Sequence, residues 1–191
     1  MNRLIIIMAA VLLLMTGSVC ASPLQDLSAG RWAVDLNWKP NSFIGGTAFE
    51  AGVTAGLGNG WGVNVRQLNY DTAGGCGDYR VKHREINLIR KIGDGLQLYA
   101  GHAHTGGGMA DAKNVAQIGV IAARKLGDRF TLYGNLGGGS HVANVEFGLS
   151  YSMRSDLEIT AVYRHLTVDR VGHGDVRDNY RGFGLGMTWK L

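Results

Sequence analysis

The sequence predicts an all-β protein: a closed, antiparallel, up-and-down transmembrane β-barrel of about ten strands, with eight strands as the alternative. Segments of roughly ten residues alternate between apolar and small or polar residues along most of the chain. Their connections alternate between tight glycine-containing turns and longer polar loops, which is the pattern of transmembrane barrels. The composition of 30 Gly, 2 Pro and 46% hydrophobic residues suits a sheet with one lipid-facing side and one polar side.

The first 21 residues are predicted to be a secretory signal peptide. Arg3 precedes an apolar run over residues 4–15, and small residues follow at the expected cleavage site. The run is shorter than the roughly 20 apolar residues that a spanning helix needs. Cys20 would permit lipidation, but the residue before it is not the Gly or Ala of a lipobox. Residues 22–191 are the predicted outer-membrane barrel domain.

Ten segments carry the strand pattern, and each is bounded by Gly, Asn, Asp or Pro. The predicted strands cover residues 31–39, 46–57, 61–70, 80–92, 96–104, 113–126, 130–136, 143–151, 157–168 and 180–191. Tight turns are expected near residues 58, 94, 128 and 155, and longer loops near residues 42, 75, 108 and 173. A short connection near Gly139 is the exception to this alternation.

The segment 143–151 shows the two faces most regularly. One face is apolar and is expected to contact lipid, and the other is polar or small and is expected to face the barrel interior. The apolar face consists of Ala143, Val145, Phe147, Leu149 and Tyr151, and the other of Asn144, Glu146, Gly148 and Ser150.

The last segment has the same alternation and continues to the final residue. Its apolar face consists of Phe183, Leu185, Met187, Trp189 and Leu191. This ending resembles the closing strand of outer-membrane β-barrels, which carries their assembly signal, although that signal usually ends in Phe or Tyr. In lipid no backbone group can bond to water, so this strand is expected to pair with the first strand and close the sheet.

Aromatic residues are expected to form two girdles at the edges of the apolar belt, where amphipathic rings favour the headgroup level. Trp32, Trp61, Phe130 and Trp189 fall toward the predicted periplasmic end, and Trp38 falls toward the outer end.

The inward face carries charges of both signs. They are Asp35, Glu50, Arg66, Glu85, Glu146 and Arg164. A ten-stranded barrel has a narrow lumen, and an unpaired charge there is costly. We therefore expect a network of ion pairs that largely fills the lumen, with a thin water or ion path as the alternative.

The chain's six histidines all map to the predicted outer end, but they do not converge on one face. His102 and His104 point outward, whereas His83 points inward beside Glu85. We therefore expect no metal site and no cofactor, and favour a belt in which the outward histidines, Lys82 and Arg84 meet lipid phosphates. Cys76 is expected to be an exposed loop thiol.

The pattern of residues 22–191 resembles the small bacterial outer-membrane β-barrel proteins, including the transmembrane domain of outer-membrane protein A and small porin-like proteins. The resemblance implies outer-membrane lipid and lipopolysaccharide, the barrel-assembly machinery and periplasmic chaperones as partners. A net charge of +4 is too mild to indicate nucleic-acid binding. The predicted function is a structural or narrow-pore role without catalysis.

Two other functions stay open. Some small outer-membrane barrels are lipid-modifying enzymes or proteases with a site at the extracellular rim; Ser140, His141, His165 and Asp169 are the candidates here, without a matching motif. The other is a secreted, lipocalin-like barrel, which would place its apolar face inside.

Overall fold

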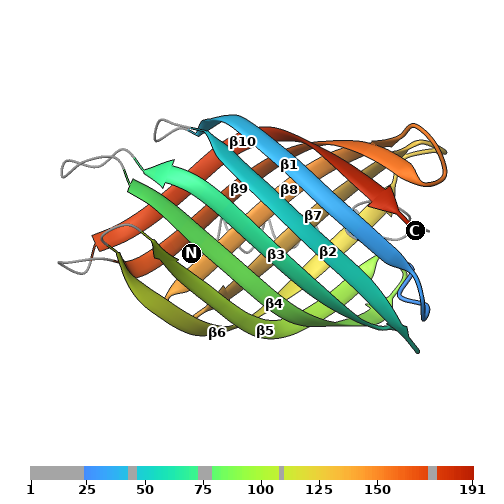
Figure 1. Ribbon diagram of the computed structural model, residues 1–191. Helices are drawn as coiled ribbons and strands as arrows, with labels where there is room; N and C mark the ends of the chain where they lie inside the picture. The colour runs from blue at the N-terminus through green and yellow to red at the C-terminus, as the bar shows by residue number, and fades with distance from the viewer. Residues whose placement is uncertain (1–23, 43–46, 73–78, 108–109, 172–175) are drawn as a thin grey trace, which may run out of the picture.

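The protein is a single closed β-barrel whose strands are strongly tilted (Figure 1). The computed structural model describes residues 24–42, 47–72, 79–107, 110–171 and 176–191. The predicted signal peptide, Cys76 and His173 therefore lie outside the described residues. The strands are β1 (Trp32–Ser42), β2 (Ala48–Gly58), β3 (Trp61–Thr72), β4 (Tyr79–Gly93), β5 (Leu96–Gly107), β6 (Ala110–Lys125), β7 (Phe130–Gly139), β8 (Val142–Ser152), β9 (Leu157–Val171) and β10 (Val176–Lys190).

Every strand pairs antiparallel with its neighbours in the chain, and β1 pairs with β10. The closing seam extends to the last residue, because Trp32 N–H donates to the Leu191 carbonyl at 3.0 Å and Leu191 N–H donates to the Trp32 carbonyl at 2.9 Å. The closed barrel therefore has no edge strand with a row of unpaired backbone groups. The predicted closed, up-and-down barrel is confirmed, with ten strands rather than eight.

The two ends of the barrel differ in their connections. At the end that also holds the C-terminus (Figure 1), here called the turn end, Asn59–Gly60 and Asp94–Gly95 reverse the chain. Asn59 and Gly60 have φ of 53° and 75°, the left-handed conformation that a two-residue hairpin turn requires. The opposite end, here called the loop end, holds the ends of β1, β3, β5 and β9 and the starts of β2, β4, β6 and β10.

The strands extend farther at the loop end than predicted. The expected long loop at 169–178 is a hairpin for most of its length, because Val171 pairs with Val176 and Val168 pairs with Asp178. Likewise β1 continues past Pro40, where the register shifts between Trp38 and Asn41 and accommodates a residue without an N–H. These segments are polar and show no alternation of apolar residues, so the strands predicted from the sequence ended too early.

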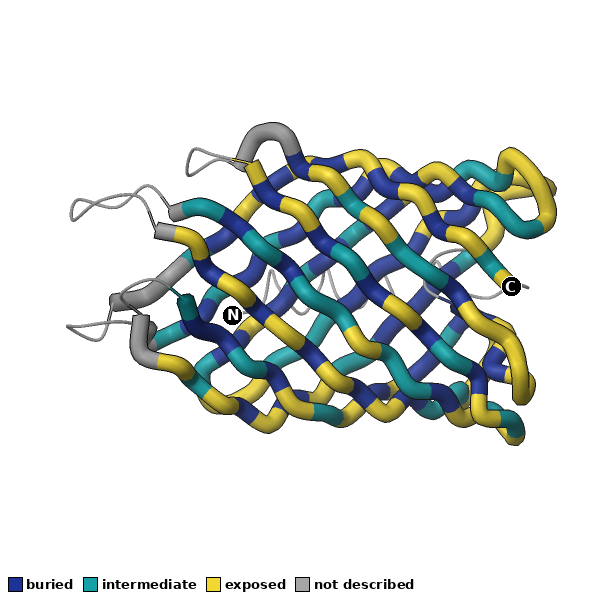
Figure 2. The backbone as a smooth tube through the Cα atoms, viewed as in Figure 1, coloured by how far each residue is buried: buried dark blue, intermediate teal, exposed yellow. Residues whose placement is uncertain are grey.

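The two faces of the sheet have opposite character, as the alternating bands in Figure 2 show. Ile118, Leu185 and Ile86 are outward, with exposed fractions of 70%, 61% and 57%. Glu50, Asn87 and Thr188 are inward and buried. A sheet that spans a bilayer must pair its backbone groups by closing on itself and must have an apolar outer surface. The lipocalin-like alternative, with its apolar face inside, is therefore wrong.

Among the described residues there is no helix long and apolar enough to span a membrane.

Candidate functional site: the barrel lumen

Charged side chains from six strands meet across the middle of the lumen. We call them the lumen network: Lys39 on β1, Glu50 on β2, Arg66 on β3, Glu85 on β4, and Glu146 and Arg164 on β8 and β9. Three cations face three carboxylates, so the formal charges balance. Balance and close pairing are what make burial of such charges tolerable.

Arg164 joins three strands across the interior. Its Nη1 lies 2.6 Å from Glu50 Oε2, its Nη2 contacts Glu85 Oε1, and its Nε donates to Asn144 Oδ1 at 2.7 Å. The side chain has no exposed surface. Each nitrogen of the guanidinium fork is thereby matched to an acceptor, the arrangement for which Arg is suited.

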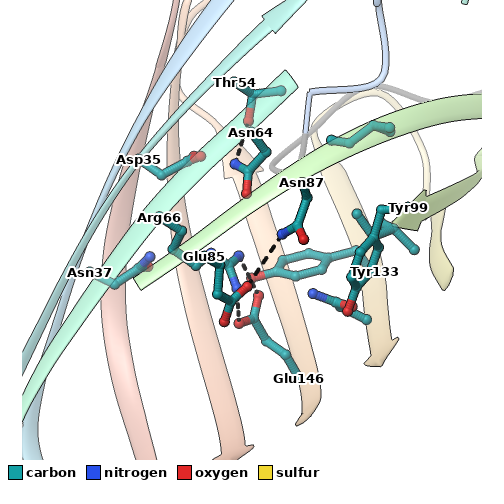
Figure 3. A pocket seen from close by; sticks show the side chains of 13 residues that line it. Asp35, Asn37, Thr54, Asn64, Arg66, Glu85, Asn87, Tyr99, Tyr133 and Glu146 are labelled. Carbon is teal, nitrogen blue, oxygen red and sulfur yellow. Dashed lines mark hydrogen bonds and ion pairs between the residues drawn. The ribbon is translucent and has the colours of Figure 1, made fainter. Parts of the chain in front are cut away.

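Arg66 and Lys39 complete the network. Arg66 makes a two-pronged contact with Glu146, at 3.0 Å through Nη1 and 3.3 Å through Nη2 (Figure 3). Its Nε lies 3.4 Å from Glu50 Oε1. Lys39 Nζ donates to the other oxygen of Glu50 at 3.0 Å. Glu50 is therefore shared by all three cations.

His83 extends the network toward β5. Its Nε2 lies 2.9 Å from Glu85 Oε1 and its Nδ1 lies 2.6 Å from the Thr105 hydroxyl. With the proton on Nε2, the ring donates to the carboxylate and accepts from the hydroxyl, so both nitrogens are satisfied without a charge on the ring. His83 thus connects Glu85 on its own strand with Thr105 on β5.

An apolar layer seals the lumen between the network and the loop end. Tyr70 and Tyr180 are in ring contact, with centroids 5.1 Å apart, and Lys39 Nζ lies 5.5 Å from the Tyr180 ring centroid. The layer consists of Ala48, Leu68, Tyr70, Val81, Val115, Val142, Leu166, Val168 and Tyr180, all buried in one cluster. These apolar side chains occupy the barrel interior at this level.

On the turn-end side of the network there is a small polar cavity (Figure 3). It offers about 30 Å³ for the centres of water molecules, and one water needs roughly 10–15 Å³ of such space. Asp35, Asn64 and Asn135 line it with Arg66 and Glu146. The cavity has room for one or two waters and no larger ligand.

A segment preceding β1 closes the lumen at the turn end. Leu24 and Leu27 are buried there in one cluster with Ile89, Tyr99 and Ile121. The backbone is held as well: Gln97 Nε2 donates to the Leu24 carbonyl at 2.8 Å, and Gly58 N–H donates to the Leu27 carbonyl at 2.9 Å. We call residues 24–28 the N-terminal segment.

Two glycines make the space that this segment occupies. A Cβ on Gly56 would lie 2.3 Å from the Ser28 carbonyl oxygen, and one on Gly62 would lie 2.8 Å from Leu27 Cδ2. Both distances are shorter than any ordinary non-bonded contact. The inner surface of β2 and β3 is therefore shaped to receive Leu27 and Ser28.

The structure brings most of the predicted inward charges together in ion pairs, and Asp35 lines the cavity beside Arg66 and Glu146. Asp35 lies toward the turn end and accepts a hydrogen bond from the Thr188 hydroxyl at 2.7 Å. Sequence reasoning left Lys39 out of the network, although its inward position was evident from the alternation. The N-terminal segment was missed entirely, and the only available signal was the spacing of Leu24 and Leu27.

The structure places the predicted aromatic and C-terminal residues on the outer face. Exposed fractions are 47% for Trp32, 55% for Trp38, 41% for Trp61, 45% for Phe130 and 53% for Trp189. Register sets Trp32, Trp61, Phe130 and Trp189 near the turn end and Trp38 toward the loop end. Phe183, Leu185, Met187 and Leu191 are exposed on the same apolar face of the closing seam.

The rim residues considered for catalysis lie at the loop end. Asp169 meets His141 through the backbone, its N–H donating to the His141 carbonyl at 2.8 Å. His165 Nε2 lies 3.3 Å from the Thr167 hydroxyl, which bonds Asn179 at 2.9 Å. Ser140 is exposed. Over the described part of the chain, no group of three His, Cys, Asp or Glu side chains could hold a metal ion.

No protein-family model and no curated protein sequence matches this chain. Several solved structures are similar in overall shape. Outer membrane protein Ail of Yersinia pestis, in a phospholipid nanodisc, has a TM-score of 0.45 at 12% identity over 85% of this chain and 99% of its own. The NanC porin has a TM-score of 0.47 at 13% identity over 84% of this chain and 100% of its own. The N-terminal β-barrel domain of Pseudomonas aeruginosa OprF has a TM-score of 0.39 at 12% identity, covering 85% and 98%. At these values the similarity says nothing of function, and the fold assignment rests on the strand pairing itself.

Proposed function

We propose that this protein is an integral outer-membrane barrel with a structural role, whose lumen is sealed in the conformation described. The observation that carries the proposal is the lumen network. Arg164 and Glu50 are buried completely or nearly so, with exposed side-chain fractions of 0% and 2%. Solutes cannot pass a cross-section filled by side chains that are fixed to one another by ion pairs.

Two further layers support the sealed lumen. The apolar layer lies on the loop-end side of the network, and the N-terminal segment closes the turn end. The three closures rest on different chemistry, namely apolar packing, ion pairing and a docked segment. No single change in conditions is expected to open all three.

The orientation follows the rule that bacterial barrels keep short turns in the periplasm and longer connections outside. The turn end is then periplasmic, and the N-terminal segment docks from the periplasmic side. The export and assembly partners are those expected from the predicted signal peptide and the closing strand. The Phe183–Leu191 face is the part of the chain offered to the barrel-assembly machinery.

Planar-bilayer recording with the purified protein tests the sealed lumen. We expect no large, stable conductance steps from the unaltered protein. The double variant Lys39→Ala/Glu50→Ala removes one cation and one carboxylate together, so the charge balance is kept while the cross-section is opened. Because the apolar layer and the N-terminal segment stay in place in this variant, its conductance is expected to exceed that of the unaltered protein only when those two closures are removed as well.

A matched control replaces a similar pair at the turn end, outside the closed cross-section. Arg154→Ala/Asp156→Ala removes an exposed pair 3.2 Å apart and is expected to leave conductance unchanged. Large porin-like steps from the unaltered protein would overturn the sealed lumen and favour the narrow-pore alternative, for which the water-sized cavity beside Arg66 is the structural argument.

A further inference from the structure

A groove lies on the outer face of the barrel near the loop end, across β1 to β4. It has a volume of about 370 Å³, and its walls are aromatic on one side and cationic on the other. Trp38 and Phe49 form the first wall, Arg80 and Lys82 form the second, and Gln67 and Asn69 lie between them. We call it the loop-end groove.

The pairing of the strands shows how the groove is built. Trp38 pairs with Phe49, Phe49 with Asn69, and Asn69 with Lys82, so these four side chains form one continuous row. Paired side chains on one face lie about 5 Å apart. The Cβ atoms of Phe49 and Lys82, two steps apart in this row, are therefore separated by about 10 Å.

The depth of this row is fixed by the rows below it. Four residues nearer the turn end, the matching row consists of Val34, Val53, Val65 and Ile86, and every member is apolar. The row between contains Gln67 and Arg84, whose Nε donates to Gln67 Oε1 at 2.8 Å. The outer face thus changes from apolar to polar at the groove, which is the depth of lipid headgroups.

The cationic wall carries more positive charge than its neighbouring carboxylate, Asp71, neutralises. Arg80 is paired with Asp71 at 3.1 Å, but Lys82 is exposed and forms no ion pair within the part of the chain that the structure describes. With Arg84 in the next row, two cations face one small area. A phosphate group satisfies such a pair through charge-assisted hydrogen bonds.

The adjoining strands β8 to β10, which continue the barrel wall on the other side of β1, lack this combination. There, the row that follows the aromatic contact between Tyr163 and Phe183 contains Arg181, His165 and Val145. One arginine stands beside a histidine and an aliphatic residue, without an aromatic platform in the same row. The groove is therefore a local feature and not a section of a uniform belt.

We propose that the loop-end groove binds a phosphorylated glycolipid of the outer leaflet. A sugar ring packs on Trp38 and Phe49, a phosphate is held by Lys82 with Arg84, and the acyl chains lie over the apolar row that contains Val53 and Val65. Gln67 and Asn69 supply polar groups for sugar hydroxyls. The proposal rests on the orientation given under the proposed function, and it does not depend on whether the lumen conducts.

Native mass spectrometry of the protein in phosphatidylcholine nanodiscs tests this site. The probe is a bis-phosphorylated diglucosamine glycolipid, titrated beside its dephosphorylated form. We expect one glycolipid to be retained at low ratios, with the phosphorylated form preferred. Lys82→Gln is expected to weaken its binding by about tenfold, the loss of one charge-assisted hydrogen bond. Trp38→Ala is expected to weaken both forms.

Arg181→Gln, which removes an exposed arginine from the loop-end half of β10, is the control and is expected to leave binding unchanged. Equal weakening by Arg181→Gln and Lys82→Gln would overturn the local site and leave only a charged belt. Equal retention of the dephosphorylated form would overturn the role of phosphate. Equal competition by phosphatidic acid would overturn recognition of the sugar. Conductance measurements test the sealed lumen separately, since none of these side chains lies in it.

Discussion

The middle of the lumen and its turn end are both closed, but by different means. In the middle, Arg164 and its carboxylate partners belong to the strands themselves. At the turn end, Leu24 and Leu27 belong to a segment that precedes the barrel and docks into it. The first closure is part of the barrel, whereas the second is added to it. The network should therefore be inseparable from folding, and the N-terminal segment should be removable.

The largest expected effect is the loss of Arg164. Arg164→Met leaves Glu85 buried without its main partner, whereas Glu50 keeps Lys39 and Arg66. Breaking a buried pair in this way costs about 3–5 kcal/mol. The free energy of unfolding, measured by urea titration in lipid vesicles, should fall by that amount. Adding Glu85→Gln to the variant should restore part of it, because one stranded charge is removed.

An exposed arginine provides the comparison for this variant. Arg154 has 73% of its side chain exposed and pairs with Asp156, and exposed pairs contribute up to about 1 kcal/mol. Arg154→Met should therefore change the free energy of unfolding very little. Similar losses for both variants would mean that the lumen network is no more important than a surface pair.

The next effect separates the N-terminal segment from the barrel. Gly56→Ala puts a Cβ 2.3 Å from the Ser28 carbonyl oxygen, so the segment must undock while the strands remain paired. Undocking exposes Leu27, whose burial is worth about 1.5–3 kcal/mol. A cysteine at position 24, in a Cys76→Ser background, should then react with a maleimide at least about tenfold faster.

Gly52→Ala is the matched control on the same face of β2. Its added Cβ would meet Val65 O at 3.5 Å, an ordinary contact, so the labelling rate should not change. Barrel integrity is followed in both variants by the shift in migration between boiled and unboiled samples. If Gly56→Ala instead abolished that shift, the segment would be an integral part of the fold and the comparison above would fail.

The smallest effect concerns Asp26 in the N-terminal segment. Hydrogen bonds from the Ser28 side chain and backbone lower the pKa of the Asp26 carboxyl below its ordinary value of 3.8, with a smaller contribution from Arg31. A lowered pKa in the docked state means that the carboxylate stabilises docking above pH 3.8 and that this stabilisation is lost as the pH falls further. Labelling at position 24 should therefore rise at low pH, and Asp26→Asn should reduce that dependence. A pH profile identical in both proteins would remove Asp26 from the docking contacts.

Much of the barrel could be predicted from its period-two alternation. Ile86 and Leu185 had to point outward once Glu85 and Gly184 pointed inward, because successive side chains of a strand alternate between faces. The same argument placed Glu50 and Arg164 inside. The strand ends at the loop end could not be found in this way, because residues such as Asp169 and Asn179 lie beyond the apolar belt and are polar on the outer face.

The sequence by itself determined which residues face lipid and which face the lumen, because that choice depends only on neighbours along the chain. Only the tertiary structure decided which inward residues meet. Arg164 and Glu50 are 114 residues apart, and their contact depends on how strand tilt and register align β9 with β2 across the interior. The docking of Leu27 against Gly62 also depends on the tertiary structure. The opening at the turn end that receives Leu27 exists only after the ten strands have closed into a barrel.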